Sequence, residues 1–239
     1  MKFTKILKNS SYFSRFQVKW KRRRKGKTDY YSRKKMISKD KRKHNFHKYR
    51  VVVRFSKHNI VCQFINSKFE GDHILNSVYS SKLKKMGIYI GLTNFSCAYI
   101  SGLLLSKNIL QKNCLNGSYC LNAKYVIKKI RTCLDIGLTR ATRGHKVFSC
   151  MKGIIDGGIE IPHKKTKYPG YTDKKNFNQS LLQERIQGKH VYDYSIGLKE
   201  EDELKFNKHF SKLSSSKTSL NRYKNLYSSL IHKLQMDSA

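Results

Sequence analysis

The sequence predicts an α/β fold, in which a central mixed β-sheet is flanked by helices, with an extended basic arm before the sheet and helices after it. Two observations support this prediction. Runs of β-branched and apolar residues at 51–53 and 60–62, separated by a Ser-Lys-His-Asn turn, are typical of a β-hairpin. Further along the chain, strand and helix patterns alternate, which favours a mixed sheet covered by helices.

The predicted core elements follow the hairpin in order. Residues 72–86 are interpreted as a helix or loop, and residues 88–92 as a short strand. A Thr-Asn cap then precedes a buried helix that starts at Phe95, in which apolar residues recur four apart. Residues 107–124 are predicted to form a surface loop. A strand is predicted over 126–136 and a helix over 147–155.

The part of the chain beyond Pro162 is more polar and is predicted to be peripheral. Four acids at residues 200–203 indicate the start of a helix, because carboxylates are favoured near the positive end of the helix dipole. Residues 219–236 carry an apolar stripe at helical spacing, which predicts a helix packed on the core; a partner-binding or membrane-surface helix is the alternative. We therefore expect an arm at 1–48, an α/β core at 49–163 and a helical extension at 164–239.

The charge of the chain is strongly positive. Its 239 residues contain 51 Lys and Arg against 15 Asp and Glu, a net charge of +36. Such an excess repels itself in a compact protein unless a polyanion neutralises it, so nucleic acid is the first expected partner and an anionic membrane the second. A small-metabolite enzyme with an acidic cleft is not expected. The many Lys, Asn and Ile residues also indicate a coding bias toward A/T-rich codons, so Arg is the more informative base.

The first 50 residues hold half of this charge. They contain 20 Lys and Arg and two Asp, a net of 20 − 2 = +18, and aromatic residues are interleaved among the bases. Basic side chains bind phosphates by displacing counterions, while aromatic rings and guanidinium planes stack on unpaired bases. This combination predicts an RNA-binding arm. A nuclear-localisation patch would explain residues 21–27 alone but not the aromatic residues around them.

A second basic segment lies at residues 139–146, just before the predicted helix at 147–155. It combines hydroxyl groups, two arginines and a glycine, and it ends in a lysine next to the predicted helix N-terminus, a combination that favours phosphate binding. The spacing of a P-loop is absent, so an ordinary polar loop is the alternative.

Catalytic, metal and membrane functions are not expected. The six cysteines lack zinc-knuckle spacing and most lie in apolar runs, as buried thiols do. The carboxylates of Asp135 and Asp156 could serve a metal-dependent nuclease, but no pair shows telling spacing. The 21 uncharged residues between Lys85 and Lys107 are interrupted by polar ones, which favours a buried helix over a membrane span. We expect no cofactor, no small-molecule substrate and no membrane partner.

Short blocks of residues in order along the chain resemble one family. They are Tyr12-Phe13, Arg15-Phe16-Gln17-Val18-Lys19, Arg22-Arg23-Arg24, the run 26–31, Lys48-Tyr49-Arg50, Glu70-Gly71-Asp72, the runs 91–94, 102–105 and 134–138, Asp156-Gly157-Gly158, Ile161-Pro162-His163 and Pro169-Gly170-Tyr171. The sequence is similar to the eukaryotic 5S-rRNA-binding protein family of the large ribosomal subunit, the universal large-subunit protein eighteen family, formerly large-subunit protein five.

This resemblance implies a structural ribosomal role without catalysis and a core laid out like ribonuclease H. It implies that 5S rRNA, large-subunit rRNA, a second 5S-binding ribosomal protein and other proteins of the central protuberance are partners, on a cytoplasmic ribosome assembled in the nucleus or nucleolus. A non-ribosomal RNA-binding assembly factor is the alternative. The side chains expected to contact RNA are Lys8, Tyr12, Phe13, Arg15, Lys19, Trp20, Arg22, Arg23, Arg24, Lys27, Tyr30, Tyr31, Arg33, Lys34, Lys48, Arg50, Arg140, Thr142, Arg143 and Lys146.

The sequence departs from the family pattern in several places. An acidic insertion that the family usually has near residues 112–130 is replaced by a shorter, basic segment. The family's long basic C-terminal tail does not follow the last predicted helix, so contacts made by that tail are not expected from these residues. Trp20 stands where Phe is usual, and Arg143-Gly144-His145 stands where Thr-Gly-Asn is common.

Overall fold

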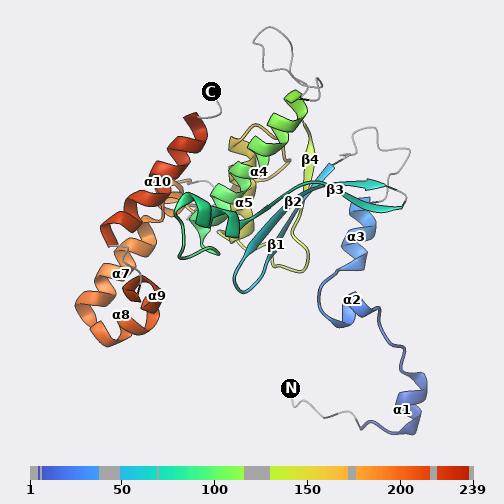
Figure 1. Ribbon diagram of the computed structural model, residues 1–239. Helices are drawn as coiled ribbons and strands as arrows, with labels where there is room; N and C mark the ends of the chain where they lie inside the picture. Colours follow the sequence, from blue (N-terminus) through green and yellow to red (C-terminus); the bar gives the residue numbers. More distant parts are fainter. Residues whose placement is uncertain are drawn as a thin grey trace. The chain divides into compact units, whose positions relative to one another are not determined.

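The computed structural model describes residues 5, 7–37, 49–68, 70–115, 130–171, 176–215 and 220–236 (Figure 1). Contacts divide the chain into two compact units, residues 1–38 and residues 39–239. The side chains of residues 113–115, 214–215, 220–224 and 235–236 are not described. Lys48 and the region of the expected insertion, residues 116–129, lie outside the described residues.

The first unit consists of short helices without a core. They are α1 (Ser10–Arg15), α2 (Lys21–Arg24) and α3 (Tyr30–Ile37), and none of them contains a buried residue. Local hydrogen bonds hold the helix ends, as where the Asn9 side chain accepts from the Tyr12 amide at 2.9 Å. A segment with so little apolar burial has few internal contacts to stabilise it, which suits a surface that is completed by a partner.

The second unit is built on a four-stranded mixed sheet, as predicted. Its strands are β1 (Tyr49–Phe55), β2 (Ile60–Lys68), β3 (Gly71–Tyr79) and β4 (Thr132–Asp135), in the order β3-β2-β1-β4. β2 pairs antiparallel with β1 and β3, whereas β4 pairs parallel with β1. The predicted hairpin is therefore confirmed, and the β1–β4 pairing brings residues 49–52 next to residues 132–135.

Two helices cover the sheet and form the core with it (Figure 1). They are α4 (Phe95–Leu115) and α5 (Lys146–Asp156), both predicted to start within a residue of where they do. Glycines allow the two helices to approach closely, since a Cβ on Gly102 would lie 2.2 Å from the Cys150 carbonyl oxygen and one on Gly153 2.1 Å from that of Tyr99. None of the described helices is long and apolar enough to cross a membrane.

The remaining elements surround this core. They are the 3-10 helices η1 (Ser80–Met86) and η2 (Lys165–Lys167), and α6 (Gln179–Gln187), α7 (Lys189–Glu201), α8 (Glu203–His209), α9 (Ser211–Ser215) and α10 (Leu220–Met236). The amphipathic helix predicted at 219–236 is confirmed as α10. Its Tyr227 and Leu234 side chains are buried in the core, which accounts for the apolar stripe.

Two predictions between residues 72 and 92 are wrong. Residues 72–79 form most of strand β3 rather than a helix or loop, because backbone pairing with β2 holds them although most of their side chains are exposed. Residues 88–92 form no strand, since Gly87 and Gly91 adopt positive φ values of 93° and 69° that interrupt an extended chain. Ile88 is buried all the same, so the apolar run marks burial rather than sheet pairing.

Three boundaries further along the chain also differ. The predicted loop at 107–124 begins too early, because α4 continues to Leu115. Of the strand predicted at 126–136, the described part is β4, which begins at Thr132. The four acids do not start one helix: Glu200 and Glu201 end α7, and the Asp202 side chain caps α8 by accepting from the Lys205 amide at 3.1 Å.

Candidate nucleic-acid interface

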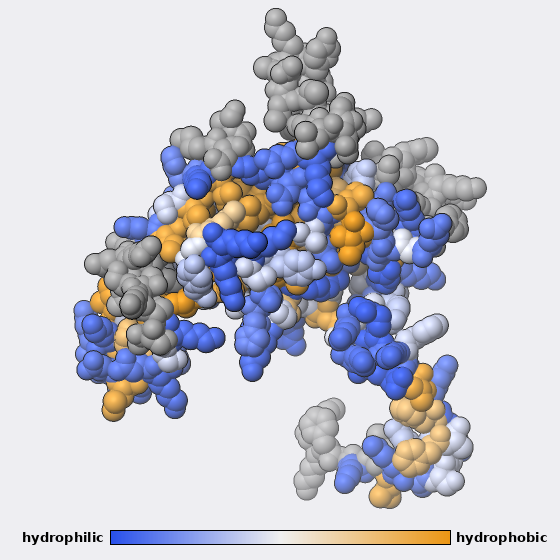
Figure 2. All heavy atoms as spheres, in the orientation of Figure 1, coloured by the Kyte–Doolittle hydropathy of each residue, from blue (hydrophilic) through white to orange (hydrophobic). Residues whose placement is uncertain are grey.

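The N-terminal unit presents aromatic rings to solvent among basic side chains. Trp20 is 76% exposed and Tyr31 70% exposed. The Tyr12 ring stacks on Phe16 with centroids 5.8 Å apart, and Trp20 lies 6.0 Å from Tyr30. In Figure 2 this part of the surface shows apolar groups beside hydrophilic ones. Exposed aromatic faces are costly in water but stack favourably on unpaired bases.

Two arginines of this unit, Arg22 and Arg24, are oriented by neutral acceptors. Arg22 Nε donates to the Thr28 hydroxyl at 2.8 Å, and Arg24 Nε donates to the Lys19 carbonyl at 3.0 Å. The only acid in the first 39 residues, Asp29, accepts hydrogen bonds from Ser32 and from the Tyr31 amide, and these bonds, led by that of the Ser32 hydroxyl, lower the pKa of Asp29. The Asp29 carboxylate therefore caps the start of α3 by accepting from backbone amides there.

Arg50 lies in a different environment from the arm residues with which it was predicted. It is 4% exposed, and its guanidinium donates to Asp72 at 2.5 Å and to Ser67 at 2.7 Å. Its Nε lies 3.5 Å from Asp135, an ion pair without hydrogen-bond geometry. Because side chains alternate along a strand, Arg50 projects from the sheet face opposite the buried Val51.

Arg54 completes this buried network and was missed by the sequence analysis. Its guanidinium donates to the Asp135 carboxylate at 2.7 Å and to the Asp135 carbonyl at 2.8 Å. The Gly137 amide donates to the same carboxylate at 3.0 Å. The β1–β4 register brings these groups together from 81 residues apart in the chain. Arg50 is therefore a structural residue of the sheet, and its burial removes it from the candidate interface.

Residues 139–145 form a largely exposed loop before α5, as expected, and Lys146 begins the helix. Arg140, Thr142 and Arg143 are exposed, and Arg143 donates to the Tyr171 carbonyl at 2.7 Å. Lys167, which the sequence analysis did not single out, braces the loop by donating to the Ala141 carbonyl at 2.9 Å. These contacts hold the loop against residues 167–171.

His145 connects this loop to α5. Its Nδ1 accepts from the Val147 amide at 3.2 Å, so the imidazole caps the helix in its neutral form. Burial, followed by the positive charge of Lys146, lowers the pKa of His145. Lys146 itself lies over the Phe55 ring, with its Nζ 5.4 Å from the centroid.

Residues 14–164 match the model of a protein family described as "Ribosomal large subunit proteins 60S L5, and 50S L18". The chain belongs to this family. It is 43% identical over 225 residues to large ribosomal subunit protein uL18 of Suberites domuncula, which covers 89% of this chain and 77% of the relative. The uL18 protein of Bombyx mori is also 43% identical, covering 89% and 75%, and that of Drosophila melanogaster 42%, covering 89% and 75%.

As a member of the L5/L18 family, the chain is a structural constituent of the large ribosomal subunit and not an enzyme. Its partners include ribosomal RNA. The predicted family and fold are thereby confirmed, and the assembly-factor alternative is not favoured.

The carboxylates considered for a nuclease have structural contacts in this L5/L18 protein. Asp135 binds the two sheet arginines, and Asp156 accepts from the Tyr99 hydroxyl at 2.8 Å and pairs with Lys152. Burial and the nearby Asp156 raise the pKa of Tyr99 well above its usual value. Within the described part of the chain, no group of three or more His, Cys, Asp or Glu side chains is placed to hold a metal ion.

Proposed function

We propose that this chain binds 5S rRNA through its N-terminal unit and the loop at 139–146, and anchors that RNA in the central protuberance. The observation that supports this most directly is the exposure of aromatic rings and arginines on the same short helices. The rings supply stacking on unpaired bases, and the guanidinium groups supply phosphate contacts. The proposed contacts are those predicted from the sequence except the buried Arg50.

We propose a separate role for each of the three regions predicted from the sequence. The arm at 1–48 and the core loop bind RNA, the core at 49–163 positions that loop, and the extension at 164–239 packs on the core. A second 5S-binding ribosomal protein and other proteins of the central protuberance would adjoin the complex. We also propose that 5S rRNA is bound during assembly in the nucleus or nucleolus, before the subunit works in the cytoplasm.

Replacing Arg22, Arg23 and Arg24 by alanine tests the role of the arm. Each lost phosphate contact should reduce the slope of log affinity against log salt by about 0.7 to 0.9, so three contacts should reduce it by roughly 2 to 3. The measurement is fluorescence anisotropy of labelled 5S rRNA over a NaCl series.

A matched control removes three exposed lysines from α7 and α8, Lys199, Lys205 and Lys208. The control should leave the slope close to that of the unmodified chain. An unchanged slope in the arginine variant, with correct folding of its core, would refute the proposed phosphate contacts of the arm.

A further inference from the structure

A basic cavity lies on the second unit, apart from the loop at 139–146. It has a volume of about 330 Å³ and is lined by side chains from four separate segments. Lys57 and His58 come from the β1–β2 turn, Lys84 from η1, Tyr89 and Thr93 from the segment before α4, and Lys212 from α9. Among its lining residues, all of which the structure describes, none is acidic.

The backbone around this cavity holds its side chains in place. Ser56 and Asn59 close the β1–β2 turn, with the Ser56 amide donating to the Asn59 carbonyl at 2.8 Å, so that Lys57 and His58 lie at its tip. On the other side, the Asn94 amide donates to the Gly91 carbonyl at 2.9 Å in a turn that leads into α4. Two of the four segments that line the cavity are thus tight turns held by backbone hydrogen bonds.

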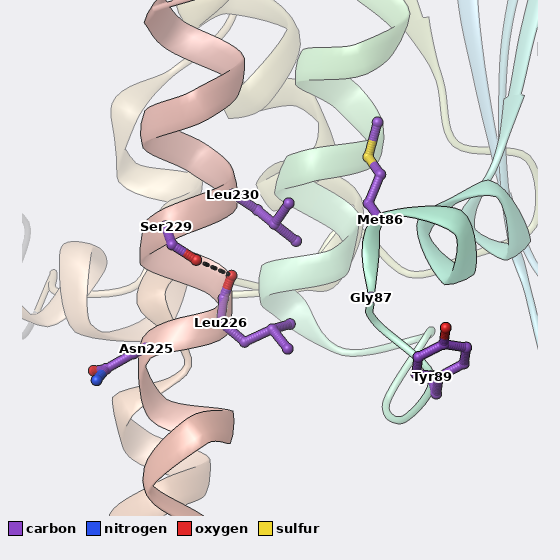
Figure 3. Close-up of a pocket in the computed structure, with 7 residues that line it drawn as sticks. All are labelled: Met86, Gly87, Tyr89, Asn225, Leu226, Ser229 and Leu230. Carbon is purple, nitrogen blue, oxygen red and sulfur yellow. Dashed lines mark hydrogen bonds between the residues drawn. The ribbon is translucent and has the colours of Figure 1, made fainter. Parts of the chain in front are cut away.

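Tyr89 is the aromatic residue of the cavity and is 69% exposed. Its neighbour Ile88 is 2% exposed and donates its amide to the Leu83 carbonyl at 3.1 Å, which anchors the backbone beside the ring. Tyr89 also lines a second pocket, shown in Figure 3, whose other lining residues include Leu226 and Leu230 of α10. An exposed tyrosine ring carried on an anchored backbone offers a flat apolar face on which a base can stack.

Thr93, two residues before the start of α4, also lines the cavity. Three lysines and an exposed ring therefore provide for phosphates and for one flat base in the same cavity.

We propose that this cavity binds an unpaired nucleotide of ribosomal RNA, with the base stacked on Tyr89 and the adjacent phosphates held by Lys57, Lys84 and Lys212. This contact goes beyond the proposed role of the arm, because it belongs to the second unit and uses different residues. An acidic peptide would match the lysines but would leave the Tyr89 face without a stacking partner, so RNA is favoured.

Photocrosslinking of the full chain to a ten-nucleotide oligouridylate that contains 4-thiouridine tests this proposal. We expect a crosslink within the tryptic peptide 86–107, which carries Tyr89, in addition to crosslinks in the arm. In a Lys57→Ala, Lys84→Ala variant, the yield at 86–107 should fall roughly tenfold for two lost phosphate contacts, while the arm crosslinks stay. The matched control Lys199→Ala, Lys208→Ala removes the same charge from exposed helix positions and should leave both yields unchanged.

Two competitors separate the possible ligands. Unlabelled oligouridylate should remove the 86–107 crosslink, whereas polyglutamate at the same charge concentration should not. The cavity proposal would be overturned if no crosslink formed at 86–107, or if the double-lysine variant gave the same crosslink yield there. It would also be overturned if polyglutamate removed this crosslink as well as oligouridylate does. Because arm crosslinks are measured in the same sample, their loss alone would count against the arm and not against the cavity. A Tyr89→Phe variant keeps an aromatic ring and should therefore keep the crosslink at 86–107. Loss of that crosslink in this variant would contradict the stacking role given to the ring.

Discussion

Replacing Arg50 by methionine tests whether the buried ion network holds the sheet together. Methionine has a similar length but no charge, so it removes the contacts to Ser67, Asp72 and Asp135 while leaving most of the packing. Asp135 would keep Arg54, whereas Asp72, whose side chain is 22% exposed, would lose the Arg50 contact at 2.5 Å and keep the hydrogen bond from the Ser67 hydroxyl.

The expected loss is about 1.5 to 3 kcal/mol of unfolding free energy, the contribution of a hydrogen bond to a charged group. The side-chain exposures are 4% for Arg50 and 7% for Asp135, so water screens these contacts less than it screens a surface pair. Urea unfolding, followed by circular dichroism, measures the loss. The double variant Arg50→Met, Asp72→Leu should recover part of it, because the carboxylate that pairs with Arg50 is then absent as well.

The exposed pair of Arg131 and Glu160 is the internal control. Its nitrogen–oxygen distance is 3.1 Å, but the side chains are 63% and 43% exposed, so Arg131→Ala should cost at most about 1 kcal/mol. If Arg50→Met also costs less than about 1 kcal/mol, the network contributes no more than a surface pair and the reasoning from burial is refuted.

Three further predictions concern the second unit. Gly153→Ala should cost about 1 to 3 kcal/mol, because its Cβ would strike the facing helix, whereas Gly197→Ala, with open space, should stabilise by about 0.5 to 1 kcal/mol; thermal melting separates them. Because the folded chain lowers the pKa of His145, its unfolded state binds more protons below about pH 6.5 and stability falls there; His145→Asn, a cap that does not titrate, should lose less stability from pH 7 to 5 in urea titrations. The hydrogen bond with the Cys62 thiol, followed by burial, raises the pKa of Cys150, so mass spectrometry should find it alkylated at pH 8 only after unfolding; rapid native alkylation would contradict this burial.

The elements that sequence reasoning found are those whose burial is visible locally. The consecutive valines of β1 and the four-residue spacing after Phe95 both lie in the core, so their patterns reflect their packing. Strand β3 was missed because its pairing with β2 depends on backbone groups, and its exposed Ile74 and Leu75 break the alternation that marks a half-buried strand. Residues 88–92 show the reverse, because Ile88 is buried although the segment pairs with no strand.

The parts of the candidate interface that are close together in the sequence could be predicted from it. The arm is one such part, because its basic side chains and aromatic rings lie within a few residues of one another. The place of Arg50 could not, since its partner Asp135 is brought to it only by the parallel β1–β4 pairing. The cavity at Tyr89 is equally invisible in the sequence, because Lys57, Lys84 and Lys212 meet there from distant segments.

The environments of the arginines explain how the chain can carry its charge. In the sheet, Arg50 and Arg54 are neutralised by carboxylates, and burial there makes the pairing part of the fold. In the arm, Arg22 and Arg24 are oriented by a hydroxyl and a carbonyl, which direct a guanidinium without neutralising it. Their full positive charge therefore stays available for the phosphates that we propose the arm binds, and RNA bound there would relieve its mutual repulsion. In this proposal the same residue type stabilises the protein where it is paired internally and the RNA complex where it is not.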